Sequence, residues 1–426
     1  MLDIKFIREN QKAIKKNCKL RNFKCGIGGF LKADDERKAL IQKIDELKNE
    51  KNRLNDQMKS AANKEEVIAK GKAIKDQLAE LEPKLEKVEK KWKKLLIKFP
   101  NMSHPAAPVG KDDSENKEIE RYGEPPKFDF QPKGHEELMG ALDLIDFERG
   151  SKVAGAKFYF LKNEAVFLEQ ALINYALDVC TKEGFTPFST PDLAKDEVLL
   201  GIGYNPRGEE TQIYSIEKTD LNLVGTAEIT MGGYHMNETF SEADLPKKYV
   251  ALSHCYRTEA GSYGRHSAGL FRVHQFTKVE MFAYTLPKKS EEMHTYLKDM
   301  EVKIFKGLGV PFRVVDICTG DLGGPAYRKY DLEAWMTSRN GWGEITSTSD
   351  TTDYQARRLN VKAVRADGRK EFLHMLNGTA IAVSRALIAI VENFQQADGS
   401  VVIPEALRKW MPGGMEIISK KDGHRS

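Results

Sequence analysis

The strongest constraint on the fold is a heptad pattern of apolar residues that runs through residues 31–98 in two parts. Its apolar positions are Ile44, Leu47, Leu54 and Met58 in the first part, and Ile74, Leu78, Leu81, Leu85, Val88, Trp92 and Leu95 in the second. Lys51 fills the remaining heptad position of the first part. Steps of three and four residues place these side chains on one stripe of a helix. Each arm of about 30 residues would extend about 45 Å at 1.5 Å per residue.

The polar segment 60–66 separates the two parts and predicts a reversal of the chain. Two arrangements are open: an antiparallel hairpin within one chain, or a coiled coil between two chains. The short break favours self-pairing, because each arm can bury its stripe on the other. Pro83 lies inside the second arm. A proline costs about 3 kcal/mol in a helix interior, so we expect a kink or local defect there.

The same region is strongly basic. Residues 1–98 carry 27 Lys and Arg side chains against 16 Asp and Glu, a formal charge of +11, and the rest of the chain carries −7. A basic segment joined to an acidic body indicates that the first part contacts a polyanion. A Lys-rich helix face that is merely solvated explains the charge about equally well.

A proline- and glycine-rich segment over residues 101–132 is expected to be a linker. After it the pattern predicts a helix over 163–183 and strands over 221–224, 249–256, 270–284, 312–316, 331–336 and 342–347. Several strands follow one another without a long helical crossover, which favours a largely antiparallel sheet. We therefore expect an α+β chain with a helical arm over 1–100, the linker, a mixed domain over 133–420 and a basic tail over 421–426.

Five cysteines form an odd set without a CxxC pair. This usage is typical of a reducing cytoplasm, and it argues against a disulfide framework and against a thiolate zinc site. The first residues have neither the apolar core of a secretory signal nor the composition of a transit peptide. The most apolar long stretch, 379–394, contains Ser384, Arg385 and Glu392 and is too short to cross a bilayer. We therefore expect a cytoplasmic protein that does not contact a membrane.

Residues 255–280 carry the most informative chemistry: a strand, a glycine-punctuated loop and a second strand. Alternation on the second strand places one set of side chains on one face, namely Arg272, His274, Phe276, Lys278, Glu280 and Phe282. Phe276 and Glu280 would lie about 13 Å apart along it. That separation suits an adenine at one end and a small polar group at the other, joined through a phosphate. An ordinary amphipathic strand with salt bridges is the alternative.

Three further segments carry candidate groups. Thr226 and Glu228 would share a strand face and could receive an ammonium group, although a plain strand end is the alternative. Glu344 could hold Mg²⁺ against a phosphate, or belong to a Ser/Thr-rich strand end. Arg385 lies in an apolar helix and needs an anionic partner, either a phosphate or a structural carboxylate.

In this order, and behind a helical hairpin, the four segments resemble the seryl-tRNA synthetase family of class II aminoacyl-tRNA synthetases. Residues 184–191 resemble motif 1, with Pro191 in the dimer-interface position. Residues 257–280 resemble motif 2 and residues 377–385 motif 3, while Thr226-Ala227-Glu228 matches the TxE element. The resemblance covers nearly the whole chain. It implies a homodimer whose residues 133–420 form a class II catalytic domain, with a six- to eight-stranded antiparallel sheet flanked by helices.

The resemblance also implies roles for individual residues. Catalysis falls to Arg257, Glu344 and Arg385. The serine site comprises Thr226, Glu228, Arg257, Glu280, Asn377 and Thr379. The ATP site comprises Arg257, Thr258, Glu259, Val273, Phe276, Glu344, Ile345, Thr346, Ser347 and Arg385. Glu344 and Ser347 would hold Mg²⁺ with ATP, and no zinc is expected.

Within these sites, Arg257 would hold the serine carboxylate and the α-phosphate. Glu259 would contact the adenine and Phe276 would stack on it. Arg385 would contact the γ-phosphate, and Glu280 would face the serine hydroxyl. Two positions depart from the commonest pattern of the family: Thr379 stands where Ser is frequent, and His266 where an acid is often seen.

The implied function is a serine–tRNA ligase that forms seryl-adenylate and transfers serine to tRNA-Ser, with tRNA-Sec a further acceptor that the family allows. The basic hairpin would grip the long variable arm of the tRNA. Two alternatives remain. An amino acid:carrier-protein ligase would lack the hairpin, and a non-catalytic tRNA-binding paralogue would have lost Arg257, Glu344 or Arg385, all of which are present.

Overall fold

The computed structural model describes residues 1–58, 64–204, 212–259 and 269–420. The chain divides into two compact units, Met1–Pro100 and Asn101–Ser426. His266, the tail 421–426 and residues 60–63 of the expected reversal lie outside the described residues.

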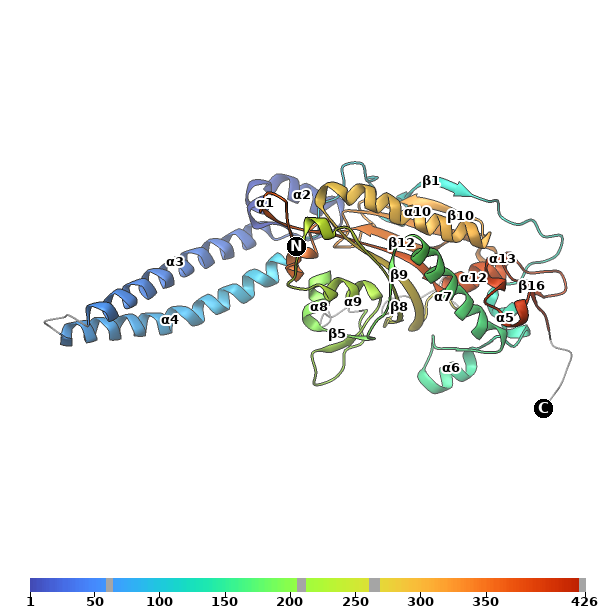
Figure 1. Cartoon of the computed structure of the whole chain (residues 1–426), viewed down its shortest axis with the longest axis horizontal. Helices are drawn as coiled ribbons and strands as arrows, with labels where there is room; N and C mark the ends of the chain where they lie inside the picture. The colour runs from blue at the N-terminus through green and yellow to red at the C-terminus, as the bar shows by residue number, and fades with distance from the viewer. Residues whose placement is uncertain (59–63, 205–211, 260–268, 421–426) are drawn as a thin grey trace. The chain divides into compact units, whose positions relative to one another are not determined.

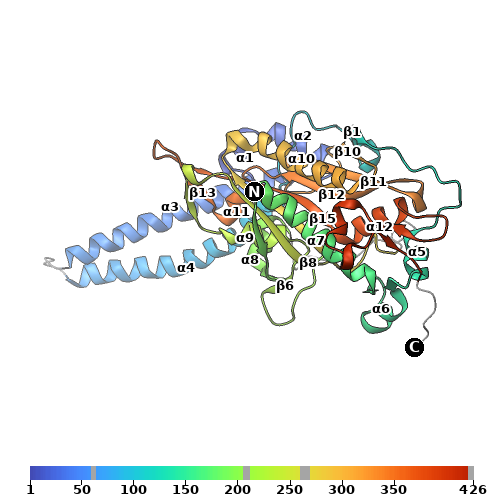
Figure 2. The same ribbon diagram turned by 45° about the vertical axis from the view of Figure 1, so that its right-hand side comes forward.

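The first unit is helical, with α1 (Ile4–Glu9), α2 (Gln11–Leu20) and the two long helices α3 (Ile27–Gln57) and α4 (Lys64–Leu96). Helices α3 and α4 run side by side (Figures 1 and 2). The predicted stripe forms their contact. Its buried members are Ile44, Leu47, Leu54, Ile74 and Leu78, with Leu81 and Leu85 partly buried against them. The antiparallel hairpin within one chain is therefore confirmed.

Polar contacts also link the two arms. Lys48 Nζ lies 3.0 Å from Glu82 Oε1, and Trp92 Nε1 donates to the buried Asp34 carboxylate at 3.1 Å. Helix α4 continues through Pro83 without a break. The exposed proline ring lies on the solvent side of the helix, so the expected defect does not interrupt the apolar contact.

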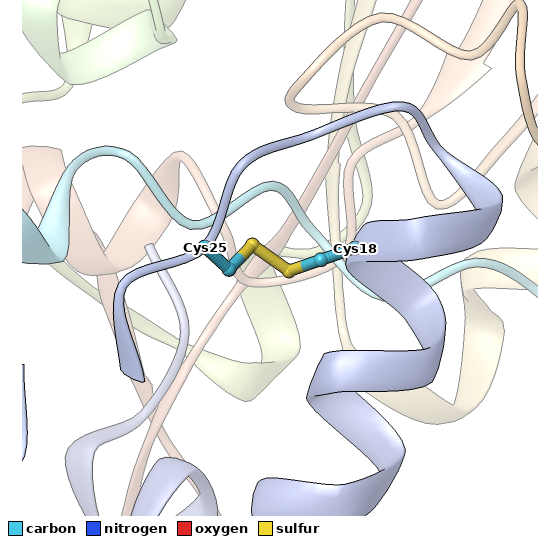
Figure 3. Close-up of a disulfide and its surroundings, with 2 residues drawn as sticks. All are labelled: Cys18 and Cys25. Carbon is cyan, nitrogen blue, oxygen red and sulfur yellow. A yellow bond between two sulfur atoms is a disulfide. The ribbon is translucent and has the colours of Figure 1, made fainter. Parts of the chain in front are cut away.

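A disulfide bond joins Cys18, in the last turns of α2, to Cys25, just before α3, with their Cα atoms 6.2 Å apart (Figure 3). The expectation that the cysteines would form no disulfide is therefore wrong for this pair. The spacing of seven residues is not a CxxC pattern, but the reversal between the two helices brings the side chains together. Cys180, Cys255 and Cys318 are buried thiols.

The second unit is built on a sheet of eight strands in the order β1-β10-β11-β12-β15-β9-β8-β4. In that order the strands are Lys117–Tyr122, Phe312–Asp316, Arg328–Met336, Gly341–Asp350, His374–Ala382, Gln275–Thr285, Lys247–Tyr256 and Thr186–Ser189. Neighbours in this sheet are antiparallel except β4 and β8, which are parallel. The expected antiparallel sheet is confirmed.

Part of the expected linker belongs to this sheet. Strand β1 pairs with β10, with Lys117 opposite Asp316 and Tyr122 opposite Phe312. The Tyr122 and Phe312 rings stack with centroids 4.9 Å apart, and Lys298 binds Glu120. A strand of six residues that pairs only at a sheet edge gives too weak a sequence signal to stand out in a proline- and glycine-rich segment.

Helices cover one face of the sheet. Helices α7 (Glu164–Lys182), α10 (Ser290–Leu308) and α12 (Val383–Asn393) pack on it (Figures 1 and 2). They bury Val279, Met281 and Ala283 of β9 in the largest apolar cluster. The alternate residues Phe282 and Tyr284 face the opposite side, beneath α8 (Asp196–Ile202) and α9 (Ala227–Tyr234). Phe276, Lys278 and Glu280 belong to this second face by the same alternation.

The remaining elements are short. The helices are α5 (His135–Ala141), α6 (Phe147–Ala154), α11 (Ala356–Leu359) and α13 (Glu405–Arg408). Paired short strands are β2 (Ile145–Asp146) with β3 (Phe160–Leu161), β5 (Leu193–Lys195) with β6 (Leu221–Leu223), and β16 (Val401–Val402) with β17 (Ile417–Ile418). Strand β13 (Lys362–Val364) pairs with both β7 (Thr239–Ser241) and β14 (Lys370–Phe372).

Two local expectations are corrected. Thr226 and Glu228 do not lie in a strand: Thr226 caps the N-terminus of α9, where its Oγ1 accepts from the Glu228 backbone N–H at 3.1 Å. The second strand of the motif 2 segment begins at Gln275 rather than at residue 270. Arg272 and His274 therefore precede the strand instead of continuing its face.

Candidate active site

A cavity of about 430 Å³ opens on the second face of the sheet. Its walls come from β9, β12 and β15, from the N-terminal ends of α9 and α12, and from Arg257, which follows β8. The predicted residues that line it are Thr226, Glu228, Arg257, Glu259, Val273, Phe276, Glu280, Glu344, Ile345, Thr346, Ser347, Asn377, Thr379 and Arg385. Thr258 does not line the cavity, and its backbone N–H donates to the Gln212 carbonyl at 3.1 Å.

Glu280, a buried carboxylate in the middle of β9, organises one end of the cavity. It accepts from Asn377 Nδ2 at 3.1 Å and from Thr379 Oγ1 at 3.0 Å, and Lys278 Nζ lies 2.6 Å from its Oε2. Residues 377–379 reach it because β15 pairs with β9, with Thr379 directly opposite Glu280. A carboxylate accepts about four hydrogen bonds, so this group retains room for one more donor.

Glu228 lies on the first turn of α9 and lines the same cavity. Gln355 Nε2 donates to its Oε1 at 2.8 Å. Burial, together with the charge of Glu280, raises the pKa of Glu228 to about 7. A cationic group bound beside Glu228 would lower this pKa and favour the ionised form of the carboxyl.

Arg257 directs a fully charged guanidinium into the cavity. Its Nε and Nη2 donate to the Gly225 carbonyl at 3.3 and 3.2 Å, and its Cζ lies 5.2 Å from the centre of the Phe276 ring. Cations over aromatic faces are attracted by the ring quadrupole. Phe276 thus lies beside Arg257, and together they form one wall of the cavity.

Glu259 lies next to Arg257 at the edge of the motif 2 segment. Its φ of +48° is in the left-handed region, which costs a non-glycine residue of order 1 kcal/mol. Arg272 Nη1 lies 3.2 Å from its Oε2. This ion pair joins the two ends of the segment that contains residues 260–268.

Glu344 and Arg385 form an ion pair on the opposite wall. Arg385 Nη1 lies 3.0 Å from Glu344 Oε1 and 3.0 Å from the Glu344 carbonyl oxygen. Burial favours the neutral acid, but the cations Arg385, Lys329 and Arg257 outweigh it and lower the pKa of Glu344 to about 2. The cavity therefore offers an ionised carboxylate and several cations, a suitable setting for a metal-bound polyphosphate.

The residues present fit Mg²⁺ carried by a nucleotide. Glu344 supplies an ionised oxygen ligand and Ser347 a hydroxyl from the same strand, and both line the cavity. Mg²⁺ usually takes one or two protein oxygens, the remainder coming from water and phosphate. Over the described ranges no group of three or more His, Cys, Asp and Glu is arranged to hold a metal by itself.

Sequence reasoning missed part of the lining. The additional residues include Tyr204, the loop segment 323–326 and Lys329. Gly323 and Gly324 adjoin Pro325, a turn-forming sequence that indicates a loop but does not say where the loop lies. Lys329 pairs with Asp331 at 3.1 Å on β11, and no periodic pattern distinguishes it from a surface lysine.

Comparison with known proteins identifies the family. Residues 1–103 match the family model "Seryl-tRNA synthetase N-terminal domain", and residues 213–394 match "tRNA synthetase class II core domain (G, H, P, S and T)". A serine–tRNA ligase of Treponema denticola is 56% identical over 412 residues, covering 96% of this chain and 98% of that protein. One from Rubrobacter xylanophilus is 52% identical, covering 98% and 99%. The chain belongs to the seryl-tRNA synthetase family.

Solved structures agree with this membership. Seryl-tRNA synthetase from Pyrococcus horikoshii, complexed with ATP, superposes with a TM-score of 0.89 at 38% identity, covering 99% of this chain and 100% of that one. The cytoplasmic serine–tRNA ligase of Naegleria fowleri, in complex with AMP, gives 0.85 at 33% identity, covering 99% of each chain. A likeness to Giardia lamblia prolyl-tRNA synthetase at 14% identity and a TM-score of 0.54 concerns the fold alone.

In this member of the seryl-tRNA synthetase family, none of the helices that the structure describes is both long and apolar enough to span a membrane.

Proposed function

We propose that this chain is a serine–tRNA ligase that activates L-serine with ATP and transfers the seryl group to the 3′ end of tRNA-Ser. The observation that carries the proposal is the convergence of two unlike subsites in one cavity of about 430 Å³. One is the carboxylate cluster of Glu228 and Glu280, suited to an ammonium and a hydroxyl. The other is the ion-pair wall of Glu344 and Arg385, suited to a polyphosphate with its metal. The full-length serine–tRNA ligase relatives support the same assignment.

The first subsite selects serine. The amino group of serine would lie against Glu228 and the Thr226 hydroxyl, and its carboxylate against Arg257. The serine hydroxyl would then donate to Glu280, which Asn377, Thr379 and Lys278 hold in place. Alanine lacks that donor and would leave a buried polar group unpaired. Sites of this kind reject such analogues by about 10⁴-fold or more.

The second subsite binds ATP. A carboxylate oxygen of serine attacks the α-phosphorus in line, the bond from that phosphorus to the bridging oxygen breaks, and pyrophosphate leaves. Arg257 would bind the α-phosphate, Arg385 the γ-phosphate, and Phe276 and Glu259 the adenine. Val273, Ile345 and Thr346, which line the cavity, complete the nucleotide contacts that we propose, and Thr258 lies outside the lining. No side chain acts as a nucleophile, so rate enhancement comes from positioning and from fixed positive charge.

Glu344 and Ser347 would hold Mg²⁺ that enters with ATP, where the metal neutralises charge on the phosphates. The low pKa of Glu344 keeps this carboxylate ionised as a ligand across the physiological range.

Transfer to tRNA completes the reaction. A terminal ribose hydroxyl of the tRNA attacks the seryl carbonyl, the carbonyl–phosphate oxygen bond breaks and AMP leaves. The helical hairpin of α3 and α4 would bind the long variable arm of tRNA-Ser. Its support is the +11 charge of residues 1–98 and the confirmed hairpin, a shape that a solvated helix face does not require.

The hairpin and the retained charged side chains disfavour the two alternatives. A carrier-protein ligase would not require the N-terminal domain that residues 1–103 match. A non-catalytic paralogue would not require Arg257, Glu344 and Arg385 in contact with one cavity.

We further propose that the chain acts as a cytoplasmic homodimer. Phe160, Val166 and Phe167 are apolar side chains between 40% and 47% exposed, near the start of α7. Exposed apolar side chains that lie close together in the sequence are suited to a protein–protein contact. The substrates ATP and tRNA support a cytoplasmic location, whereas the Cys18–Cys25 disulfide is a feature against it, because reducing conditions keep most cytoplasmic thiols unpaired.

The experiment that tests the function is transfer of labelled serine to total cellular tRNA with ATP and Mg²⁺, alongside serine-dependent exchange of pyrophosphate into ATP. Label on tRNA is expected. The variant Arg257→Ala should lose exchange by about 10³-fold or more, while Arg149→Ala, at an exposed arginine outside the cavity, should match the wild type. Exchange without label on tRNA would favour a different acceptor, and the absence of both activities would overturn the proposal.

A further inference from the structure

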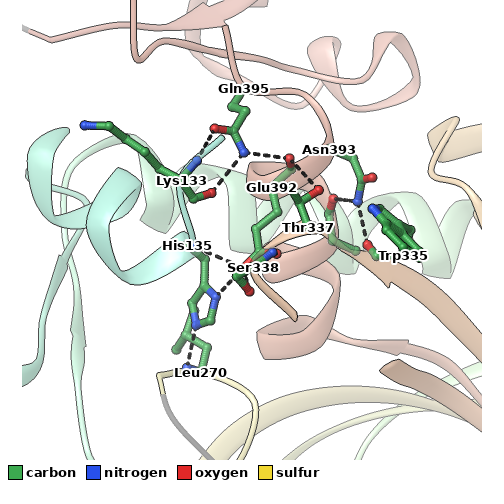
Figure 4. A network of polar contacts seen from close by, with 10 residues as sticks. Lys133, His135, Leu270, Trp335, Thr337, Ser338, Glu392, Asn393 and Gln395 are labelled. Atoms are coloured by element: carbon green, nitrogen blue, oxygen red, sulfur yellow. Dashed lines mark hydrogen bonds and ion pairs between the residues drawn. The ribbon is translucent and has the colours of Figure 1, made fainter. Parts of the chain in front are cut away.

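A buried carboxylate on α12 lies at the centre of a hydrogen-bond network outside the cavity (Figure 4). Glu392 accepts from the His135 backbone N–H at 3.1 Å and from His135 Nδ1 at 2.7 Å. It also accepts from the Ser338 backbone N–H at 2.9 Å and from Ser338 Oγ at 2.7 Å. Burial opposes its charge, but the donors outweigh burial and hold the pKa of Glu392 below its ordinary value. The ionised carboxylate therefore fixes the His135 ring.

The hydrogen-bond partners of His135 determine which ring nitrogen carries the hydrogen. Glu392 can only accept, so Nδ1 carries the hydrogen. On the other side of the ring, Nε2 accepts the backbone N–H of Leu270 at 3.1 Å (Figure 4). An imidazolium would present N–H groups on both sides and could not accept from Leu270. The two contacts together require the neutral Nδ1–H form.

The chain comes very close to His135 just before Leu270. Gly269 has a φ of +59°, and a Cβ built on it would lie 2.1 Å from His135 Nε2. A glycine is thus needed here both for the backbone conformation and for the close approach. His135 therefore holds the backbone at Gly269 and Leu270.

Directly after this point, Phe271 lines the cavity. The guanidinium of Arg385 lies over its ring at 4.7 Å, and that of Arg339 at 3.8 Å. Arg339 follows Ser338 in the chain, so the network reaches this ring from two directions. The ring attracts both guanidinium groups, so its place helps to set where Arg385 lies beside Glu344.

We propose that His135 is a positioning residue for the nucleotide subsite: its Nε2 anchors the Leu270 N–H and thereby places Phe271 against Arg385. The inference rests on the proposed use of ATP, and on the assignment of Arg385 to the γ-phosphate. His135 itself does not line the cavity and touches no reacting atom.

Two substitutions of His135 test its hydrogen bonds to Glu392 and to Leu270 separately. In His135→Asn the side-chain amide can replace Nδ1 as a donor to Glu392 but does not reach Leu270. In His135→Gln the amide oxygen can take the place of Nε2 and accept from Leu270. If His135 served only to satisfy Glu392, Asn would be the better replacement, whereas the proposal requires that Gln be better.

The measurement is serine-dependent pyrophosphate exchange by the full-length protein, with the KM for ATP and for serine determined separately. We expect His135→Asn to raise the KM for ATP about tenfold, since the loss of one buried hydrogen bond corresponds to about a tenfold change in binding. The KM for serine should change less than twofold. His135→Gln should restore the KM for ATP to within about threefold of wild type. Phe271→Leu, which leaves the network intact, should reproduce the effect of Asn.

His104→Asn is the matched control. His104 also accepts a backbone N–H, from Ala106 at 3.0 Å, and contacts a carboxylate, Glu291 at 3.3 Å, but it does not line the cavity. It should leave both KM values unchanged. Thermal melting of each variant reports folding. If His135→Asn does not fold, the KM for ATP of Phe271→Leu still tests whether the Phe271 ring contributes to ATP binding.

Three outcomes would overturn the inference. The first is a KM for ATP in a folded His135→Asn variant within twofold of wild type. The second is His135→Gln impaired as strongly as His135→Asn, and the third is an unchanged KM for ATP in Phe271→Leu. If the wild-type protein shows no exchange, the proposed function itself fails, a result distinct from these three.

Discussion

Glu228 is the side chain of the serine subsite whose charge changes near neutral pH. Its pKa of about 7 means that the ionised form, which an ammonium group requires, is the minor form below that pH. We expect kcat/KM for serine to fall about tenfold for each pH unit below 7. The measurement is pyrophosphate exchange at subsaturating serine between pH 5.5 and 8.5.

The matched variant is Glu228→Gln, which cannot ionise. It should bind serine weakly at every pH and lose the dependence around pH 7. The same shift also predicts a direction for stability. The folded-state pKa of Glu228 lies above the unfolded value, so its ionisation makes the free energy of unfolding fall as pH rises from about 4.5 through 7. The variant should show a smaller fall, because Asp331 and Asp350 also have raised pKa values and remain. A wild-type profile that is flat across pH 7 would contradict the assignment of Glu228.

Glu280 determines selection among amino acids in the same subsite. Glu280→Gln keeps the size of the side chain but removes the charge that pairs with Lys278. We expect the preference for serine over alanine to fall at least a hundredfold in exchange assays. Thr379→Ser retains the hydroxyl that donates to Glu280 and should retain the preference. An unchanged ratio in a folded Glu280→Gln variant would show that this carboxylate does not read the hydroxyl.

At the scale of elements, regular patterns were predictable and irregular ones were not. The period of two on β9 correctly placed Phe276, Lys278 and Glu280 together, and the heptad stripe predicted the pairing of α3 with α4. The expectation of a strand at Thr226 is wrong, because three residues do not define a period. A threonine that opens a helical pattern is, however, a common N-cap, and that signal could have located α9.

Other features depend on contacts between distant parts of the chain. Strand β1 exists because β10 offers it an edge, and Phe312 gives Tyr122 a stacking partner. Lys329 and the loop segment 323–326 reach the cavity because β11 lies beside β12. Sequence spacing contains none of this information, since each contact joins residues that no local pattern relates.

The turn between α2 and α3 supplies a prediction at this scale. Closing a loop of about eight residues with a disulfide should stabilise the fold by about 2 kcal/mol by restricting the unfolded chain. Dithiothreitol should therefore lower the urea midpoint of the wild-type protein and leave a Cys18→Ser/Cys25→Ser double variant unchanged. Mass spectrometry after alkylation without prior reduction should find Cys18 and Cys25 unalkylated, because both sulfur atoms are in the disulfide. Two alkylated thiols in freshly purified protein would contradict the bond.

At the scale of the whole molecule, the two units differ in charge, +11 for residues 1–98 and −7 for the remainder, and we propose that they divide the reaction between them. The cavity and its lining belong entirely to the second unit. Activation of serine should then proceed without the outer part of the hairpin, whereas tRNA charging should not. The two partial reactions can be measured on one protein, which makes the division testable.

The hairpin can be shortened without disturbing its base. Lys48 and Glu82 contact each other across the arms, so residues 49–80 can be replaced by a short glycine–serine turn between facing positions. Those residues carry seven basic and six acidic side chains, so their removal changes the net charge by one. We expect pyrophosphate exchange within about twofold of wild type, and kcat/KM for tRNA reduced about a hundredfold or more. Because the net charge hardly changes, such a loss would reflect missing contacts with the tRNA rather than a weaker electrostatic attraction of the whole protein for it.

A second variant changes charge and leaves the length of the arm intact. Replacing the exposed Lys12, Lys15, Lys16 and Lys19 of α2 with glutamine removes four positive charges. If this helix contacts the tRNA backbone, the KM for tRNA should rise and its dependence on salt should weaken, because fewer counterions are released on binding. For the shortened protein that lacks residues 49–80, normal charging of tRNA would show that the outer hairpin does not bind the tRNA. An unchanged salt dependence in the α2 variant would confine recognition to the hairpin itself, since the charge of α2 would then be only solvated.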